Sequence, residues 1–363
     1  MENGKLSERI LKRSVLRQFH NDSGNNNTIS AAVGNDCAFL CTKEGYETAV
    51  NTQTVCFGGS KAGFYAVMQA VNHIAASGAM PTAVTDAVIL PAEADEPLLK
   101  EIVSGIREAC DKVDAIMKEI SENNSIKVIC GHTEISSAVS VPIVSVTAFG
   151  DILCGDGSEG KELRQQGKSC EDGRKTLARI GENHMKPGQQ IVMSKYIGLE
   201  GTAILAQRYR ERLRSKLPVK MIDEAVGYEE MISVLPEAAG ATKSGVCAMH
   251  ALSQGGVFGA LWEMAQASGT GLKIDLKAIP VKQETIEICE QLDINPYRLL
   301  SGGSLLISSD DGEALVRSLE DNGIPACIIG YATDGNDRVL TGTEDDACRY
   351  LEPVNPEELF RAL

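Results

Sequence analysis

The fold is decided by the stretch Val71-Asn72-His73-Ile74-Ala75-Ala76-Ser77-Gly78-Ala79-Met80-Pro81, which joins a buried helix to a buried strand. Apolar residues upstream of Ser77 follow the i, i+3, i+4, i+7 spacing of a helix with one buried stripe. They are Phe64, Val67, Met68, Val71, Ile74 and Ala75. The helix should end near Ser77-Gly78, with Pro81 beyond it, and residues 82–90 should form a buried strand.

Outward from this stretch, helical and strand patterns alternate along the whole chain. The first half predicts a long amphipathic helix over 96–120 and strands over 126–130 and 141–149. The second half predicts strands over 190–195, 272–276, 304–309 and 326–332, and helices over 201–213, 256–267, 283–292 and 312–322. This alternation predicts an α/β fold with mixed sheets.

The length of 363 residues predicts two domains, because single hydrophobic cores stop growing at roughly 250–300 residues. We place an N-terminal domain at 1–150 and a C-terminal domain at 186–345, with a tail at 346–363. Between the domains, residues 151–185 are polar, glycine-bearing and weakly periodic. They predict a mobile, extended connector.

Composition excludes several classes of protein. Apolar residues make up 43% of the chain, and no apolar run approaches the roughly 20 residues that span a bilayer. The N-terminus lacks the apolar core of a signal peptide, so we expect a cytoplasmic protein that neither enters nor crosses a membrane. A net charge of −15 repels phosphate backbones, so no nucleic-acid partner is expected. Eleven cysteines without a C-x-x-C pair indicate reduced packing residues.

Four ordered segments carry a resemblance to a known superfamily. They are Gly34-Asn35-Asp36-Cys37-Ala38, the opening stretch 71–81, Gly131-His132-Thr133-Glu134, and Met249-His250-Ala251-Leu252-Ser253-Gln254-Gly255-Gly256. Together they resemble the PurM-like superfamily of aminoimidazole ribonucleotide synthetase, selenophosphate synthetase, thiamine-monophosphate kinase and the hydrogenase maturation factors. With Gly198-Leu199-Glu200-Gly201-Thr202 and Ser301-Gly302-Gly303-Ser304, the chain is most similar to the HypE-like hydrogenase maturation factors.

This resemblance implies a homodimer in which the N-terminal sheets pair into a barrel. It also implies a cleft that binds ATP, with acidic residues that hold Mg²⁺ against the triphosphate, and a partner from a maturation pathway. Magnesium requires oxygen ligands, and phosphoryl transfer depends mainly on metal and positioning. The carboxylates at the family positions are therefore the test of function.

Several of these carboxylates are replaced. Asn35 replaces the first acid of its segment, and Gln53 replaces the Asp of the Thr-Asp pair. His73 replaces the Asp of the Asn-Asp pair, and Ala251 replaces the Asp of the His-Asp pair. Asp36 remains as a weak metal ligand. His132 stands for the Asp of Gly-Asp-Thr-Glu, although His is ordinary there in the closer group. The loss of about four negative charges predicts weak Mg²⁺ binding.

The residues expected to contact a cofactor are Asp36, Gln53, Lys61, Asn72, His73, His132, Thr133, Glu134, Gly255 and Gly256. Gly255-Gly256 opens a predicted helix, whose free amides suit phosphate, although tight packing would also require glycine. Lys61, after Gly58-Gly59-Ser60, is a candidate phosphate contact.

Three functions follow as alternatives. The first is a weakly catalytic or non-catalytic relative that binds nucleotide or a maturation partner. The second is an active ATP-dependent phosphoryl-transfer enzyme that uses Asp36 and Glu134. The third is a metal- or small-molecule-binding protein, with Asp36, His73 and His132 as a two-histidine, one-carboxylate site. The end Phe360-Arg361-Ala362-Leu363 has no terminal cysteine, so nitrile-group synthesis is not expected.

Overall fold

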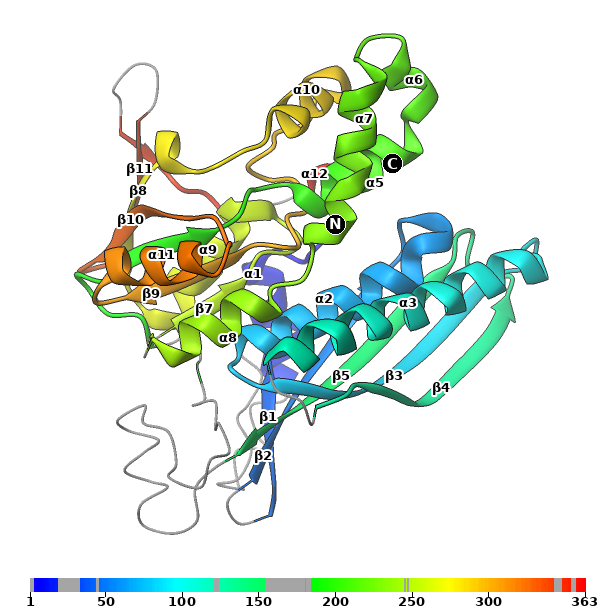
Figure 1. The fold of residues 1–363 in the computed structure, drawn as a ribbon, viewed down its shortest axis with the longest axis horizontal. Coiled ribbons are helices and arrows are strands. Elements are labelled where there is room, and N and C mark those ends of the chain that lie inside the picture. The colour runs from blue at the N-terminus through cyan, green and yellow to red at the C-terminus, as the bar shows by residue number, and fades with distance from the viewer. Residues whose placement is uncertain are drawn as a thin grey trace. The chain divides into compact units, whose positions relative to one another are not determined.

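The computed structural model describes residues 3–18, 33–43, 46–120, 124–153, 180, 184–244, 246, 248–342, 348–353 and 357–363. They form two compact units, one of Met1–Asp36 with Ile180–Leu363 and one of Cys37–Arg179 (Figure 1). Most of the predicted connector 151–185 lies outside the described residues. We placed residues 1–36 in the N-terminal domain, whereas in the structure they group with the C-terminal half. The reason is local contact: Lys5 pairs with Glu263 and Glu8 with Trp262.

The unit of Cys37–Arg179 is built on a five-stranded sheet. Its strands, in spatial order, are β1 (Ala38–Lys43), β2 (Tyr46–Val55), β5 (Ile143–Leu153), β3 (Met80–Pro91) and β4 (Lys127–Ser136). The pair β3–β4 is parallel, since α3 (Glu96–Ile120) connects the two strands, and the other pairs are antiparallel. A 3₁₀ turn, η3 (Gly59–Lys61), leads into α2 (Ala62–Ala76).

Helices α2 and α3 lie side by side on one face of this sheet (Figure 1). The predicted helix is present as α2, but every one of its residues is buried and not only the predicted stripe, and Gly63 allows the close approach to α3. A Cβ at Gly63 would lie 2.2 Å from the carbonyl oxygen of Ile102. On β2, Ala49 and Val55 are buried while Thr52 and Thr54 are exposed, so only one face of the sheet is covered within this unit.

The other unit is built on a seven-stranded sheet. Its strands, in spatial order, are β12 (Arg349–Tyr350), β11 (Arg338–Thr341), β8 (Gly271–Asp275), β10 (Ala326–Thr333), β6 (Gln190–Ser194), β9 (Leu305–Ser309) and β7 (Ala248–Ala251). Its α-helices are α1 (Glu8–Ile10), α5 (Leu199–Arg208), α6 (Arg210–Arg214), α7 (Val219–Val226), α8 (Leu235–Lys243), α9 (Gly256–Ser268), α10 (Gln283–Leu292), α11 (Gly312–Asp321) and α12 (Glu358–Ala362). Short π and 3₁₀ turns are η1 (Leu11–Val15), η2 (Leu16–Gln18), η5 (Gly227–Met231) and η6 (Leu276–Ala278).

Helices cover both faces of the seven-stranded sheet. Ile191 and Met193 of β6 pack in one apolar cluster with Leu261 and Met264 of α9. Val192, which points to the opposite face, contacts Gly312 at the start of α11. The middle of β6, Ile191 to Met193, is therefore buried on both faces of the sheet, which explains its run of three apolar residues.

The predicted α/β class with two mixed sheets is confirmed, whereas the dimer barrel stays a prediction. Two predicted elements differ from the observed ones. The strand predicted over 126–130 continues to Ser136, so the Gly131–Glu134 motif lies on a strand. The helix predicted over 201–213 is interrupted at Tyr209, where the backbone turns out of the helical region. None of the described helices combines the length and apolar character needed to span a bilayer.

Candidate functional site

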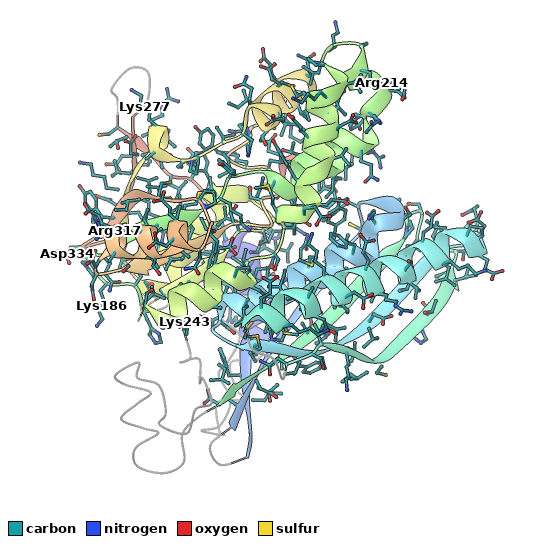
Figure 2. The ribbon with its side chains drawn as sticks, viewed as in Figure 1. Lys186, Arg214, Lys243, Lys277, Arg317 and Asp334 are labelled. Carbon is teal, nitrogen blue, oxygen red and sulfur yellow. The ribbon has the colours of Figure 1, made fainter. Side chains whose placement is uncertain are left out.

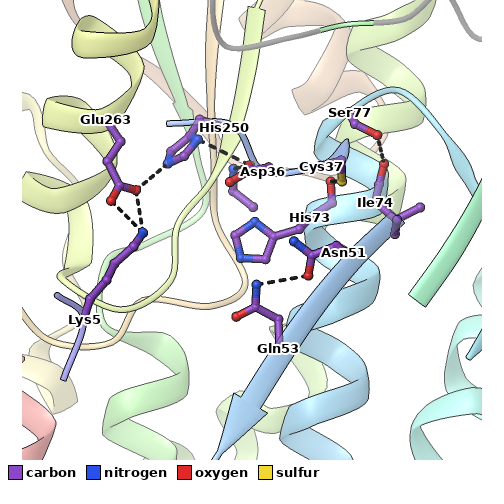
Figure 3. A network of polar contacts seen from close by, with 11 residues as sticks. Lys5, Asp36, Cys37, Asn51, Gln53, His73, Ile74, Ser77, His250 and Glu263 are labelled. Atoms are coloured by element: carbon purple, nitrogen blue, oxygen red, sulfur yellow. Dashed lines mark hydrogen bonds and ion pairs between the residues drawn. The ribbon is translucent and has the colours of Figure 1, made fainter. Parts of the chain in front are cut away.

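A chain of four charged or polar side chains lies in the unit of the seven-stranded sheet (Figure 3). Lys5, from the N-terminal segment, lies 2.6 Å from a carboxylate oxygen of Glu263 on α9. Glu263 also contacts His250 on β7, since the Nε2 of His250 lies 3.3 Å from its carboxylate. Its Nδ1 lies 3.3 Å from Oδ2 of Asp36. Along this row of side chains, Lys5–Glu263–His250–Asp36, nitrogen groups thus alternate with carboxylates.

The charges of Lys5 and Glu263 in this row stabilise each other. Burial alone would raise the pKa of Glu263, but Lys5 and His250 hold it at about 2. Burial would lower the pKa of Lys5, yet Glu263 and Asp36 raise it above its ordinary value. Glu263 is therefore a carboxylate and Lys5 an ammonium over the whole physiological range.

Asp36 is the one predicted metal ligand that remains an acid, and its Oδ2 is engaged by protein donors. The backbone N–H of Ala251 donates to Oδ2 over 3.2 Å, and the carboxylate is 5% exposed. Ala251 itself presents a buried methyl group where the family pattern has a second acid. Because Mg²⁺ needs several free oxygen ligands, this donor set does not fit the ion.

An acidic side chain of the protein itself, Glu357, lies at the start of α9. The N–H of Gly255, predicted to bind phosphate, donates to the carboxylate of Glu357. The same carboxylate accepts from the N–H of Leu300 at 2.9 Å and of Leu359 at 3.3 Å. At Gly256, φ is +61° and a Cβ would lie 2.5 Å from the carbonyl oxygen of Tyr297. Tight packing and the positive φ therefore require glycine at position 256.

Glu357 is 3% exposed, and burial raises its pKa to about 7 despite the three backbone donors. It lies 102 positions from Gly255 in sequence, and no motif marked it. A pocket of about 50 Å³ adjoins it, enough for one or two water molecules. The pocket lies between the Lys5–Glu263 pair and the start of α9. Its polar lining includes Lys5, Glu8, Gln254, Trp262, Glu263 and Glu357.

In the other unit, the predicted residues Gln53 and His73 lie near each other on β2 and α2 (Figure 3). The side-chain amide of Gln53 on β2 donates to Asn51 over 3.0 Å. Asn72 and His73 are buried on α2, and the Cys37 thiol donates to the backbone oxygen of His73 over 3.3 Å. Amides and an imidazole thus lie at the positions where the resemblance implies acids.

The remaining predicted residues form local pairs. Lys61 lies 3.2 Å from Glu108 of α3, and His132 lies 3.2 Å from Glu134 on β4. Thr133 lies between the latter two on the same exposed strand. In the parts of the chain that the structure describes, no group of three or more His, Cys, Asp or Glu residues could hold a metal ion. The two-histidine, one-carboxylate hypothesis therefore has no geometric support there.

The fold defines a two-unit α/β protein with one mixed sheet in each unit. Two domain families match the chain: AIR synthase related protein, N-terminal domain, at 34–152, and AIR synthase related protein, C-terminal domain, at 186–342. The chain belongs to the AIR synthase related proteins, and the predicted resemblance is confirmed.

Named relatives agree with this assignment. A putative hydrogenase expression/formation protein of Methanocaldococcus jannaschii is 26% identical, over 94% of this chain and 91% of the relative. The carbamoyl dehydratase HypE of Rhodobacter capsulatus is 26% identical, over 84% of this chain and 80% of the relative.

Two solved structures share the fold. A HypE–HypF complex has a TM-score of 0.69 at 21% identity, covering 93% of this chain and 99% of that chain. A HypE structure in complex with ATP has a TM-score of 0.63 at 18% identity, covering 98% and 97%.

Proposed function

We propose that this chain is a HypE-like protein of metalloenzyme maturation that binds nucleotide with little dependence on Mg²⁺ and hydrolyses ATP slowly or not at all. Support comes from its hydrogenase-formation relatives and from the ATP held by a HypE structure of the same fold. The observation that carries the proposal is the engagement of Asp36 by His250 and by the N–H of Ala251. A buried carboxylate that already contacts polar groups of its own chain has fewer free oxygens to offer an external cation.

Calorimetric titration of ATP and of ADP, with and without Mg²⁺, tests the proposal on the full chain. We expect similar affinities in both conditions and a turnover near background in a phosphate-release assay. Robust Mg²⁺-dependent hydrolysis by the pure protein would overturn it. If the chain is instead an active phosphoryl-transfer enzyme, the wild type should hydrolyse ATP with Mg²⁺ and Asp36→Ala should lose this activity.

Restoring one acid should create a metal response. Ala251→Asp places a second carboxylate beside Asp36, and two buried like charges destabilise the fold until a cation binds between them. Mg²⁺ well above its Kd should then restore about 1–3 kcal/mol, visible as a rise in Tm. The wild type should show no such rise.

Ala251→Asn is the matched control, since it adds nearly the same volume without the charge. If Mg²⁺ does not raise the Tm of Ala251→Asp, then one restored carboxylate is not enough to rebuild a metal site here. A wild-type Tm that rises with Mg²⁺ would contradict the proposed metal independence.

The homodimer belongs to the same proposal. Strand β4 is a ten-residue edge of the five-stranded sheet, and its unpaired backbone groups are a template for another strand. The two most exposed of its large apolar side chains are Ile129, at 61%, and Ile135, at 66%. A second copy would cover both. The HypE–HypF complex also supports a maturation protein as a further partner.

Charge on this edge should break the dimer. Ile129→Glu/Ile135→Glu is expected to raise the dimer Kd at least tenfold, because two carboxylates would be desolvated at the interface. Light scattering during size-exclusion chromatography measures it. Val103→Glu on α3, where the valine is 47% exposed, is the control and should leave the mass unchanged. A wild type that is monomeric at micromolar concentration would rule out the dimer.

A further inference from the structure

A basic stretch interrupts this acidic chain between residues 208 and 220. It contains Arg208, Arg210, Arg212, Arg214, Lys216 and Lys220 but one acid, Glu211. The whole chain, in contrast, has 50 acidic against 35 basic residues. The stretch comprises the end of α5, all of α6 and the start of α7, and Figure 2 shows Arg214 at the outer end of this region.

Half of these cations are paired within the protein. Arg210 pairs with Asp223, Arg214 lies 3.1 Å from Glu211, and Lys220 lies 3.6 Å from Glu224. Arg208, Arg212 and Lys216 are all exposed, and none forms an ion pair with a carboxylate among the described residues. Arg208 is the last residue of α5, Arg212 lies in α6 and Lys216 comes two residues after α6 ends, so the three cations follow one another along this short segment.

A tyrosine organises two of the unpaired cations. The guanidinium carbons of Arg208 and Arg212 lie 6.0 Å and 5.8 Å from the centre of the Tyr209 ring. The hydroxyl of Tyr209 donates to the backbone oxygen of Ala362, and Arg212 donates to the backbone oxygen of Gln291 over 3.3 Å. The ring is therefore anchored, and both arginines are held beside it. We call Arg208, Tyr209, Arg212 and Lys216 the arginine–tyrosine patch.

We propose that the arginine–tyrosine patch binds an acidic segment of a partner protein. Guanidinium groups bind carboxylates through paired N–H donors, and they retain most of these donors here. Arginine and tyrosine are also the side chains that contribute most to binding at protein interfaces. This inference is independent of nucleotide binding.

A protein segment fits the patch better than a nucleic acid does. The patch is short, and outside it acids outnumber cations over the chain as a whole. A long polyanion would extend beyond the patch onto this acidic surface and be repelled, whereas a short run of carboxylates would end within it.

Fluorescence anisotropy with a fluorescein-labelled octaglutamate peptide, in 50 mM salt, tests the proposal on the full chain. Binding by the wild type and a loss of at least fivefold in Arg208→Gln/Arg212→Gln/Lys216→Gln are expected. Arg208→Lys/Arg212→Lys keeps the charge but removes the planar donor pair, so it should lose about two- to threefold. Circular dichroism checks that each variant is folded.

The matched control is Lys100→Gln/Arg107→Gln/Lys118→Gln, which removes three exposed cations from α3 and should bind like the wild type. Equal losses in the two triple variants would reduce the effect to net charge and overturn the proposal. So would an absence of peptide binding, or binding of single-stranded oligothymidylate as tight as that of the peptide.

Discussion

The Lys195→Met variant is expected to lose about 3–5 kcal/mol of unfolding free energy, because it leaves a buried carboxylate without its cation. The ammonium of Lys195 lies 2.5 Å from Glu237, and the two side chains are 10% and 1% exposed. It also donates to the backbone oxygens of Met231 at 2.8 Å and Ser233 at 2.7 Å. One substitution thus removes the cation from a buried carboxylate and a donor from two backbone oxygens. Urea denaturation measures the loss.

Two further variants separate this explanation from general disruption. Lys195→Met/Glu237→Leu removes both charges and should recover a large part of the stability. Lys100→Met breaks an ion pair whose side chains are both 74% exposed, and it should change stability by less than about 0.5 kcal/mol. A double variant less stable than Lys195→Met would contradict a role for the unpaired charge.

Glu357→Gln should change how stability depends on pH. The folded-state pKa of Glu357 is raised from 4.5 to about 7, so the folded protein holds this proton more tightly than the unfolded chain does. The stability from the bound proton is complete below pH 4.5 and is lost as pH rises towards 7. Glutamine does not titrate and avoids this loss. Relative to the wild type, the variant should therefore gain about 3 kcal/mol between pH 4.5 and pH 8.

Thermal unfolding of both proteins across this pH range measures the difference in slope. The absolute offset is separate, since a glutamine amide cannot accept every backbone bond that the carboxylate accepts, and the N–H of Gly255 loses its partner. Glu313→Gln, at a side chain that is 72% exposed, controls for the loss of one negative charge. Parallel pH profiles for wild type and Glu357→Gln would show that Glu357 is not the group responsible.

Long periodic segments made most of the fold predictable. The stripe from Phe64 to Ala75 and the run 96–120 correspond to α2 and α3. In α3, burial along one face leaves a helical period in the sequence, whereas α2 is buried on all sides and shows its period through its larger apolar residues. Strand β7 was not predicted, since its four buried residues are too few to show a period. The interruption at Tyr209 also left no signal, because its flanking residues are good helix formers.

The candidate site was predictable only in part. The segments around Asp36 and His250 could be recognised by their motifs, and the structure places the two side chains 3.3 Å apart. Lys5 and Glu357 could not, because each meets its partners through contacts more than 100 positions apart in sequence. The basic stretch 208–220 was missed for another reason, since the net charge of the whole chain conceals a local excess of cations.

The order in which the units can form follows from the way the chain divides between them. Residues 37–179 are continuous, so this unit can fold as soon as it leaves the ribosome. The other unit combines Met1–Asp36 with Ile180–Leu363, and Lys5 meets Glu263 only after the intervening residues are synthesised. Residues 1–36 are thus translated well before the residues with which they pack.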